Sequence, residues 1–166
     1  MLAPLGSHNP KILILGSLPS QQSMLALQYY AHPQNAFWWI MQKILQQSKW
    51  ESYHHKSVCL SQNHIRVWDV LQDAERPGSL DSSIAIGSEK FNDLQNLAIQ
   101  HPQLALVAFN GKKAAALFKR HMSSQQNVQN IIFVTLPSTS PAHAAISRQN
   151  KLEQWTNSLS PYLTHD

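Results

Sequence analysis

The stretch Lys11-Ile-Leu-Ile-Leu15, ended by Gly16, decides the fold class of this sequence. A short, continuous apolar run that stops at a turn residue predicts a strand buried on both faces, as in parallel sheets. Three later stretches add to it, the first of them weaker: Ile65-Arg-Val-Trp-Asp-Val-Leu71, Leu104-Ala-Leu-Val-Ala-Phe109 and Ile131-Ile-Phe-Val-Thr135. The sequence therefore predicts a sheet of about four strands.

Helical patterns lie between and after these runs. Apolar residues recur at helical spacing over residues 36–47, 89–100, 112–121 and 147–159, and Ser88 is placed to cap the second. Alternating strands and helices predict an α/β fold, a three-layer α/β/α arrangement around a mostly parallel central sheet. Ligands bind at the carboxyl ends of such strands, so we expect the site in the loops after Leu15, Phe109 and Thr135.

Composition narrows the class of protein. The 166 residues predict one domain, 1–166. Charged residues make up only 13%, and 13 Lys and Arg against 9 Asp and Glu give a net charge of +4, compatible with an anionic partner. The single cysteine, Cys59, excludes an internal disulfide and a Cys-rich metal site. No apolar run approaches the ~18 residues of a membrane span, so we expect a soluble, cytoplasmic protein without membrane contact.

The three expected site loops are unusual in composition. Gly16-Ser-Leu-Pro-Ser20 lacks both the dinucleotide fingerprint and the phosphate-loop motif. The stretch Tyr29-Tyr-Ala-His32-Pro-Gln-Asn35-Ala-Phe-Trp-Trp39 places aromatic rings beside an amide, and such rings suit stacking on a nucleobase. Asn35 is also a plausible N-cap for the following helix. Leu136-Pro-Ser-Thr-Ser-Pro141-Ala-His-Ala144 offers hydroxyls and amides between prolines, which suit phosphate contacts.

These stretches together resemble the uracil-DNA glycosylase superfamily. The pattern G-S-L-P-S…Y-Y-A-H-P-x-N-A-F-W is similar to the first motif of its mismatch-specific branch, and residues 136–142 stand where the superfamily carries a Pro-Ser-rich loop that enters the DNA groove. The most similar family is the DNA-deoxyinosine (hypoxanthine-DNA) glycosylases, which also resemble the segments 67–84 and 109–111. The resemblance covers residues from about Lys11 to Trp155. It implies a monofunctional glycosylase of base excision repair that flips a deaminated base, preferably hypoxanthine, out of DNA and hydrolyses its bond to the sugar.

The resemblance also implies a role for each matching residue. Most of the superfamily activates water with an Asp or Asn at the position of Leu18 or a Glu at that of Ser17. The deoxyinosine branch lacks that group and is similar in relying on the asparagine matching Asn35, the expected catalytic residue. Tyr30 would stack on the flipped base, Asn110 would read its edge, and Gly16, Ser17 and Leu18 would face the departing ring. Ser138, Thr139 and Ser140 would contact phosphates and Pro141 or Ala142 would act as the wedge.

Further residues receive weaker roles. A cationic surface could come from helix residues and one residue near the C-terminus: Lys112, Lys113, Lys119, Arg120 and Arg148. Asp69 would anchor the first loop or act on the leaving base. None of these steps needs a metal or another cofactor. The expected partner is DNA containing a deaminated base, bound by a monomer.

Three alternatives follow from the same residues. The first is a glycosylase for uracil or a G:U or G:T mismatch, because a similar pocket outline serves those bases. The second is a catalytically weak DNA-binding member of the same fold, which Leu18 favours and Asn35 opposes. An unrelated serine hydrolase is disfavoured, because the G-x-S-x-G elbow is missing. Whether Asn35 is catalytic or only a helix cap stays open at this point.

Overall fold

The computed structural model describes residues 1–122 and 130–163. Five strands form the main sheet: β1 (Leu5–Gly6), β2 (Ile12–Gly16), β3 (Ile65–Asp69), β6 (Leu106–Asn110) and β7 (Ile132–Leu136). Their order is β1-β3-β2-β6-β7, and all neighbours are parallel except β1, which runs antiparallel to β3. The four predicted strands are therefore confirmed, and β1 adds a short fifth strand at one edge.

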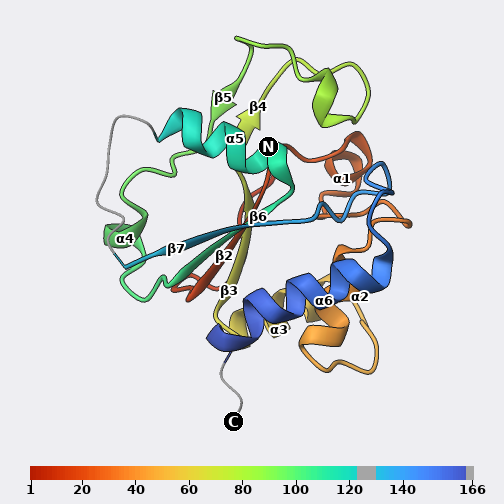
Figure 1. Cartoon of the computed structure of the whole chain (residues 1–166), viewed down its shortest axis with the longest axis vertical. Coiled ribbons are helices and arrows are strands. Elements are labelled where there is room, and N and C mark those ends of the chain that lie inside the picture. Colours follow the sequence, from red (N-terminus) through yellow and green to blue (C-terminus); the bar gives the residue numbers. More distant parts are fainter. Residues whose placement is uncertain (123–129, 164–166) are drawn as a thin grey trace.

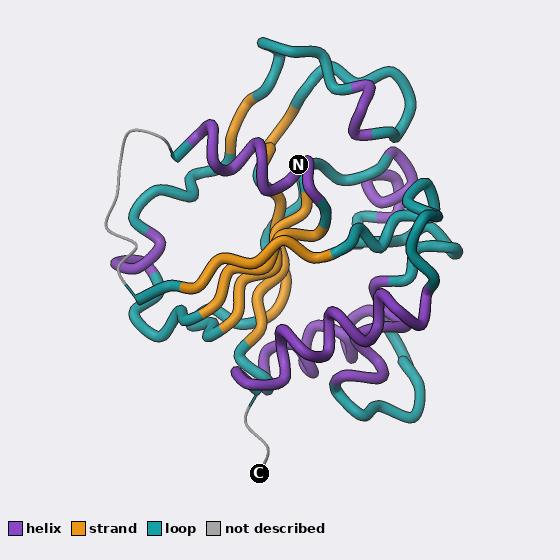
Figure 2. The backbone as a smooth tube through the Cα atoms, viewed as in Figure 1, coloured by secondary structure: helices purple, strands orange, loops and turns teal. Residues whose placement is uncertain are grey.

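Helices cover both faces of the sheet (Figure 1). The helices on one face are α2 (Phe37–Ile44), α3 (Tyr53–Gln62) and α6 (Arg148–Leu159), and those on the other are α4 (Leu97–Gln100) and α5 (Lys112–His121). The tube in Figure 2 shows the sheet between these layers, which confirms the three-layer α/β/α fold. In the described residues, no helix combines the length and the apolar character needed to cross a membrane.

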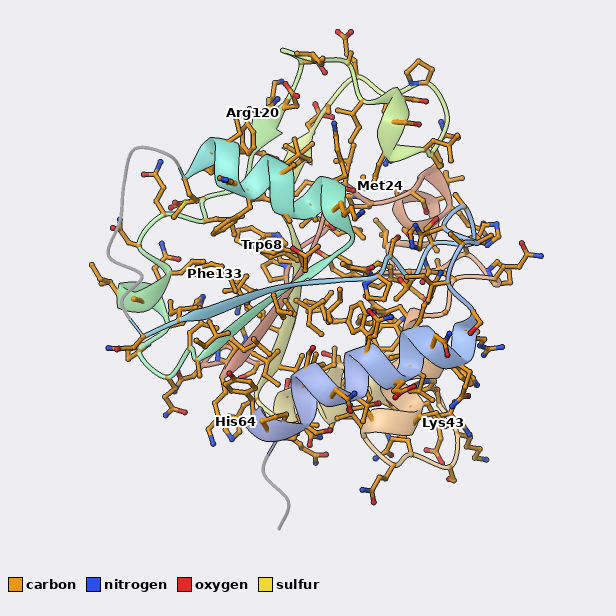
Figure 3. The ribbon with its side chains drawn as sticks, viewed as in Figure 1. Met24, Lys43, His64, Trp68, Arg120 and Phe133 are labelled. Carbon is orange, nitrogen blue, oxygen red and sulfur yellow. The ribbon has the colours of Figure 1, made fainter. Side chains whose placement is uncertain are left out.

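Two apolar cores explain why the central strands β2 and β6 are continuous apolar runs. The edge strand β7 differs from the expectation of a buried strand, because Ile132 and Phe133 are exposed. Ile12 and Ile14 of β2 belong to the core beneath α2 and α6, whereas Leu13 and Leu15 belong to the core beneath α5. Each such side chain contributes about 1.5–3 kcal/mol when it is fully buried. The side chains that fill both cores are drawn in Figure 3. A strand that is buried on both faces shows no alternation of polar and apolar residues, and such strands are typical of parallel sheets.

Helix ends follow local side-chain rules. Ser20, Ser52 and Ser147 cap α1 (Gln21–Ala26), α3 and α6, each accepting a hydrogen bond from the backbone N–H three residues later. Helix α5 begins directly after Gly111, whose φ of +98° suits glycine. The helix predicted at 112–121 is confirmed with the same bounds, and those at 36–47 and 147–159 are confirmed with shorter bounds. A single turn, η2 (Ser160–Tyr162), follows α6.

The helix predicted over residues 89–100 is wrong. Its first part is β5 (Lys90–Phe91), which pairs with β4 (Leu71–Asp73) in a separate two-stranded sheet, and only α4 at its end is helical. Asn92 explains the difference, because its side-chain amide donates to the Asp69 carbonyl (2.9 Å) and its backbone N–H donates to the Val70 carbonyl (3.0 Å). Ser88 does not cap a helix; its hydroxyl accepts from the N–H of Glu75 and donates to the Ala85 carbonyl.

Candidate active site

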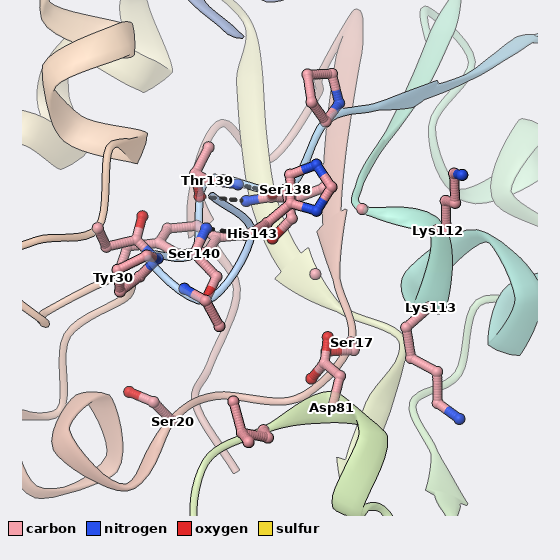
Figure 4. A pocket seen from close by; sticks show the side chains of 18 of the residues that line it. Ser17, Ser20, Tyr30, Asp81, Lys112, Lys113, Ser138, Thr139, Ser140 and His143 are labelled. Atoms are coloured by element: carbon pink, nitrogen blue, oxygen red, sulfur yellow. Dashed lines mark hydrogen bonds between the residues drawn. The ribbon is translucent and has the colours of Figure 1, made fainter. Parts of the chain in front are cut away.

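A pocket of about 930 Å³ lies at the carboxyl ends of β2, β3, β6 and β7 (Figure 4). Because parallel strands bring these ends to one edge, loops far apart in the sequence meet there. The pocket is lined by all eleven site residues expected from the sequence: Gly16, Ser17, Leu18, Tyr30, Asn35, Asn110, Ser138, Thr139, Ser140, Pro141 and Ala142. Among the described residues, no group of three or more His, Cys, Asp or Glu side chains could hold a metal ion.

The loop after β2 is held through its carbonyl groups. Four consecutive residues use their carbonyls as hydrogen-bond acceptors, and every donor lies in the segment 70–76. Val70 N–H donates to Gly16 (2.8 Å), Leu71 N–H to Ser17 (2.9 Å), and the Arg76 guanidinium to Leu18 (3.4 Å) and Pro19. The loop is therefore fixed from one side.

A single-turn helix, η1 (Asp81–Ser83), covers this loop. The Ser17 hydroxyl donates to Asp81 Oδ1 at 2.6 Å, and Arg76 lies 3.6 Å from the same oxygen. Ser17 and Asp81 face each other in Figure 4. Arg76 thus links the η1 segment to the loop below it, and Asp81 becomes a charged group of the pocket wall.

Asp69, the last residue of β3, lies beside Gly16 in the floor of the pocket. A Cβ on Gly16 would come within 2.6 Å of Asp69 Oδ1 and 3.0 Å of the Tyr30 hydroxyl, so only glycine leaves room for both groups. Asp69 is 4% exposed. Burial, reinforced by the negative charge of Asp81 and opposed by Arg76, raises the pKa of this carboxyl to about 8.

Tyr30 stands in the pocket wall with a left-handed φ of +54°. One face of its ring stacks on Phe37, with centroids 4.1 Å apart, so only the opposite face is left for a base. Its hydroxyl is buried and makes no hydrogen bond of normal geometry with the described residues. The Asn110 side chain lies close enough to lower the pKa of Tyr30, but burial dominates and raises that pKa above its usual range. The neighbouring Tyr29 is a core residue instead, 3% exposed, and its hydroxyl donates to the Leu2 carbonyl.

Asn35 has a structural role and free polar groups as well. The N-cap position of α2 is Ala36, whereas the sequence suggests Asn35. Asn35 caps the first turn from one residue outside it, because its Oδ1 accepts from the backbone N–H of Phe37 at 2.9 Å. Its own backbone N–H donates to the His32 carbonyl. The cap occupies one lone pair of Oδ1, which leaves a second lone pair and both N–H bonds of the amide for water or substrate. Capping and a catalytic role are therefore compatible.

Asn110 and Thr139 form a buried clamp between β6 and the loop after β7. Asn110 Nδ2 donates to Thr139 Oγ1, and the Thr139 backbone N–H donates to Asn110 Oδ1, both at 2.9 Å. The Thr139 carbonyl accepts from the Ala36 N–H at 3.0 Å, which ties the same loop to the start of α2. The clamp leaves Asn110 one N–H and one lone pair for reading a base.

The clamp also changes the role expected for Thr139. This residue is 1% exposed and its hydroxyl is held by Asn110, so its position favours anchoring the loop over the phosphate contact expected from the sequence. The tip of the loop is different, because Pro141 and Ala142 are exposed. Helix α6 braces the loop from below: Lys151 Nζ donates to the His143 carbonyl (2.6 Å), and Trp155 Nε1 donates to the Pro137 carbonyl (2.9 Å).

The expected cations do not share one surface. Lys112 and Lys113, in the first turn of α5, line the pocket (Figure 4). Lys119 and Arg120 lie at the opposite end of that helix, where Arg120 pairs with Glu89. The Arg148 guanidinium lies over the Trp39 ring, 3.9 Å from its centroid. The structure thus places two of the five cations at the pocket.

Comparison with known proteins identifies the family. The model of the uracil DNA glycosylase superfamily matches residues 3–163. This chain belongs to the uracil DNA glycosylase superfamily. A Methanosarcina acetivorans protein named hypoxanthine DNA glycosylase is 37% identical over 151 residues, 89% of each chain. A Methanosarcina barkeri protein of the same name is 38% identical over 112 residues, which is 67% of this chain and 70% of that protein.

A solved structure supports the same family. The solution NMR structure of a Methanosarcina acetivorans protein, described as a candidate uracil DNA glycosylase, has a TM-score of 0.75 and 33% identity. It covers 97% of this chain and 96% of that one. The superfamily resemblance and the fold inferred from the sequence are therefore confirmed.

Two charged residues of this superfamily member received no role from the sequence. Arg76 and Asp81 flank the turn around Gly78, within a segment recognised as similar to the deoxyinosine family. Their position at the pocket depends on contacts across 57 to 64 residues of chain. The residues next to Arg76 and Asp81 in the sequence do not indicate these contacts. The sequence shows only that an Arg and an Asp lie on either side of a Pro-Gly turn.

Proposed function

We propose that this protein is a monofunctional DNA glycosylase that removes hypoxanthine from deoxyinosine in DNA. One observation carries the proposal: the loop after β2, Tyr30 with Asn35, and the loop after β7 all line one pocket at the carboxyl edge of the sheet. Its volume of about 930 Å³ has room for a purine nucleotide. The name of the two curated relatives supports hypoxanthine as the base.

The DNA would be held at the mouth of this pocket. Flipping a nucleotide costs a few kcal/mol, and the exposed Pro141 and Ala142 are placed to fill the gap it leaves. Bracing by Lys151 and Trp155 supports this role, because a wedge must resist the pressure of the stacked bases. Ser138, Ser140, Lys112 and Lys113 are the proposed phosphate contacts. One chain supplies the whole pocket, which supports action as a monomer.

The reaction breaks the bond between C1′ and the base nitrogen. The base departs as an anion with the bonding electron pair, and the sugar becomes an oxocarbenium-like ion that a water molecule attacks at C1′. The water loses a proton to solvent as the new C–O bond forms, and the departing base anion takes up a proton from solvent. Asn35 is the proposed catalytic residue: the free lone pair of its Oδ1 can accept a hydrogen bond from that water. The loop at Ser17 and Leu18 is fixed beforehand through its carbonyls, so its backbone groups can face the growing negative charge of the base without moving.

A direct assay tests this function. Labelled duplexes carrying one deoxyinosine, one deoxyuridine or only normal bases are incubated with the protein and treated with alkali, which cuts the strand at abasic sites. We expect cleavage at deoxyinosine that exceeds cleavage at deoxyuridine and is missing from the normal duplex. Cleavage at deoxyuridine alone would favour a uracil enzyme. Salt-sensitive DNA binding without cleavage of any duplex would contradict the proposed glycosylase activity.

The phosphate contacts can be tested by salt dependence. Replacing Lys112 and Lys113 together by Gln should make the fall of log K for DNA binding with log salt concentration less steep, by about 1–2 in the magnitude of the slope. One or two phosphate contacts are lost in this variant. Lys119→Gln is the matched control, since Lys119 lies on the same helix away from the pocket and should leave the slope unchanged. Fluorescence anisotropy over a salt series measures both. Equal slopes for the wild type and the double variant would remove these lysines from the interface.

A further inference from the structure

The floor of the pocket contains a carboxyl group that the reaction described above does not use. Asp69 ends β3 at the register position opposite Gly16, and its side chain lines the pocket although only 4% of it is exposed. Its backbone carbonyl is held by the Asn92 amide at 2.9 Å. The missing side chain of Gly16 makes the space for Asp69 Oδ1. The residue is therefore held in the pocket wall beside Gly16.

A second polar group points to a ligand at the same place. The Tyr30 hydroxyl lies against the same side of Gly16 as Asp69 Oδ1. It is buried and makes no hydrogen bond of normal geometry with the described residues, although the Asn110 side chain lies nearby. Buried polar atoms are rarely left unpaired in a native structure. An unpaired hydroxyl beside a buried carboxyl is expected where a polar ligand completes the hydrogen bonds.

Burial favours the neutral form of Asp69, and the charged groups that face it act in both directions. From the η1 segment Asp81 adds a like charge, whereas Arg76 and the N-terminal amine oppose it. From the aromatic stretch, Tyr29 and Tyr30 are uncharged and their own pKa values are raised by burial and by Asp69. Tyr53 of α3 behaves in the same way. Burial outweighs these charges and raises the pKa of Asp69 to about 8, so the carboxyl keeps its proton at neutral pH.

We propose that the Asp69 carboxyl, beside Gly16 and the Tyr30 hydroxyl in the pocket, binds the edge of the flipped base at which a ring N–H stands next to a carbonyl. This inference rests on the proposed function and names the group that recognises the base. A neutral carboxyl offers one donor and one acceptor side by side, which match the O6 acceptor and N1–H donor of hypoxanthine in two hydrogen bonds. An ionised carboxylate offers acceptors only and would repel O6.

This assignment moves base reading from Asn110 to Asp69. The Asn110 amide spends its oxygen and one N–H on Thr139, whereas the Asp69 side chain has no such partner in the described structure. Deamination creates the N–H and carbonyl edge in both hypoxanthine and uracil, and Asp69 accepts both. Guanine and thymine carry the same edge, so their rejection comes from the cost of flipping a correctly paired base. The acid can also pair with adenine, and discrimination against adenine then comes from flipping, which is cheapest for a mispaired base.

The test compares rates of deoxyinosine cleavage under single-turnover conditions between pH 6.5 and 9.5. We expect the wild-type rate to fall about tenfold per pH unit above the pKa of Asp69. Asp69→Asn keeps a donor and an acceptor at every pH, so it should retain at least about a tenth of the wild-type rate at pH 6.5 and lack this fall. Asp69→Ala should lose about 10- to 100-fold at pH 6.5, as expected for a lost two-bond base contact.

Controls separate the role of Asp69 from other causes. Ionisation of the base's own N1–H would affect the wild type and Asp69→Asn alike, so only the difference between their profiles belongs to Asp69. Asp93→Asn is the matched control, because Asp93 is exposed and outside the pocket; its profile should follow the wild type. The Tm of Asp69→Asn relative to the wild type should rise between about pH 4 and pH 8, because the unfolded wild type loses the Asp69 proton before the folded one.

The outcomes are distinct. Cleavage by the wild type with parallel profiles for wild type and Asp69→Asn would overturn the role of Asp69 and leave the glycosylase function standing. A rate for Asp69→Ala within threefold of the wild type at pH 6.5 would do the same. Cleavage of no duplex by the wild type at any pH would overturn the glycosylase function and the role of Asp69 together.

Discussion

Asn35→Ala should lower the single-turnover rate of hypoxanthine release by about 100- to 1000-fold, the effect of removing one oriented polar group from a transition state. The substituted side chain cannot hold the attacking water, whereas the pocket, Tyr30 and the loop after β7 are unchanged. DNA affinity should therefore stay within about threefold of the wild type, which anisotropy measures alongside the cleavage rate.

Capping by Asn35 requires a control, because Asn35→Ala also removes the hydrogen bond to the Phe37 N–H. Loss of such a cap costs about 1 kcal/mol. Asn35→Ser keeps a capping oxygen but is too short to hold the water, so it should recover stability in urea without recovering the rate. Recovery of the rate by Ser in step with stability would show that Asn35 acts only as a cap.

Asn110→Ala should lower the free energy of unfolding by about 2–4 kcal/mol. Two buried hydrogen bonds disappear, and the N–H and hydroxyl of Thr139 are left without partners at 1% exposure. The loop after β7 would lose its tie to β6, so the rate of base release should fall as well. Urea unfolding measures the first effect; a loss below 1 kcal/mol would show that the clamp contributes little.

A double-mutant cycle separates the clamp from the pocket role of Asn110. Thr139→Val removes only the hydroxyl and keeps the backbone N–H that donates to Asn110. If the two side chains stabilise the loop through each other, the double variant should be about 0.5–3 kcal/mol less destabilised than the sum of the single variants. Additive losses would contradict the clamp.

The sequence predicted the fold where one physical signal dominated. Continuous apolar runs located the four parallel strands, and amphipathic spacing located α2, α5 and α6. Helix α3 could not be predicted from the sequence, because it buries only Cys59 and Leu60 and shows little apolar periodicity. The segment 89–100 was misassigned because Asn92 bonds to the end of β3, a contact across 23 residues that outweighs the local helical pattern.

The residues that line the pocket could be predicted from the sequence, whereas most of the contacts between them could not. Chain segments that follow parallel strands must converge, so the pocket residues could be named from the loops that follow β2, β6 and β7. The engagement of Asn110 by Thr139 across 29 residues and that of Ser17 by Asp81 across 64 have no local signature. Nor does the sequence show that Asp69 and Tyr30 both lie against Gly16. Such contacts depend on the folded arrangement alone.

Release of hypoxanthine from DNA as a free base is the step that defines the proposed function. Chromatography with mass detection of the supernatant, after reaction with a duplex carrying one deoxyinosine and another carrying one deoxyuridine, measures this directly. We expect free hypoxanthine in amounts equal to the abasic sites formed, more of it than uracil, and almost none with Asn35→Ala. Strand breaks without free hypoxanthine, or uracil as the only base released, would contradict it.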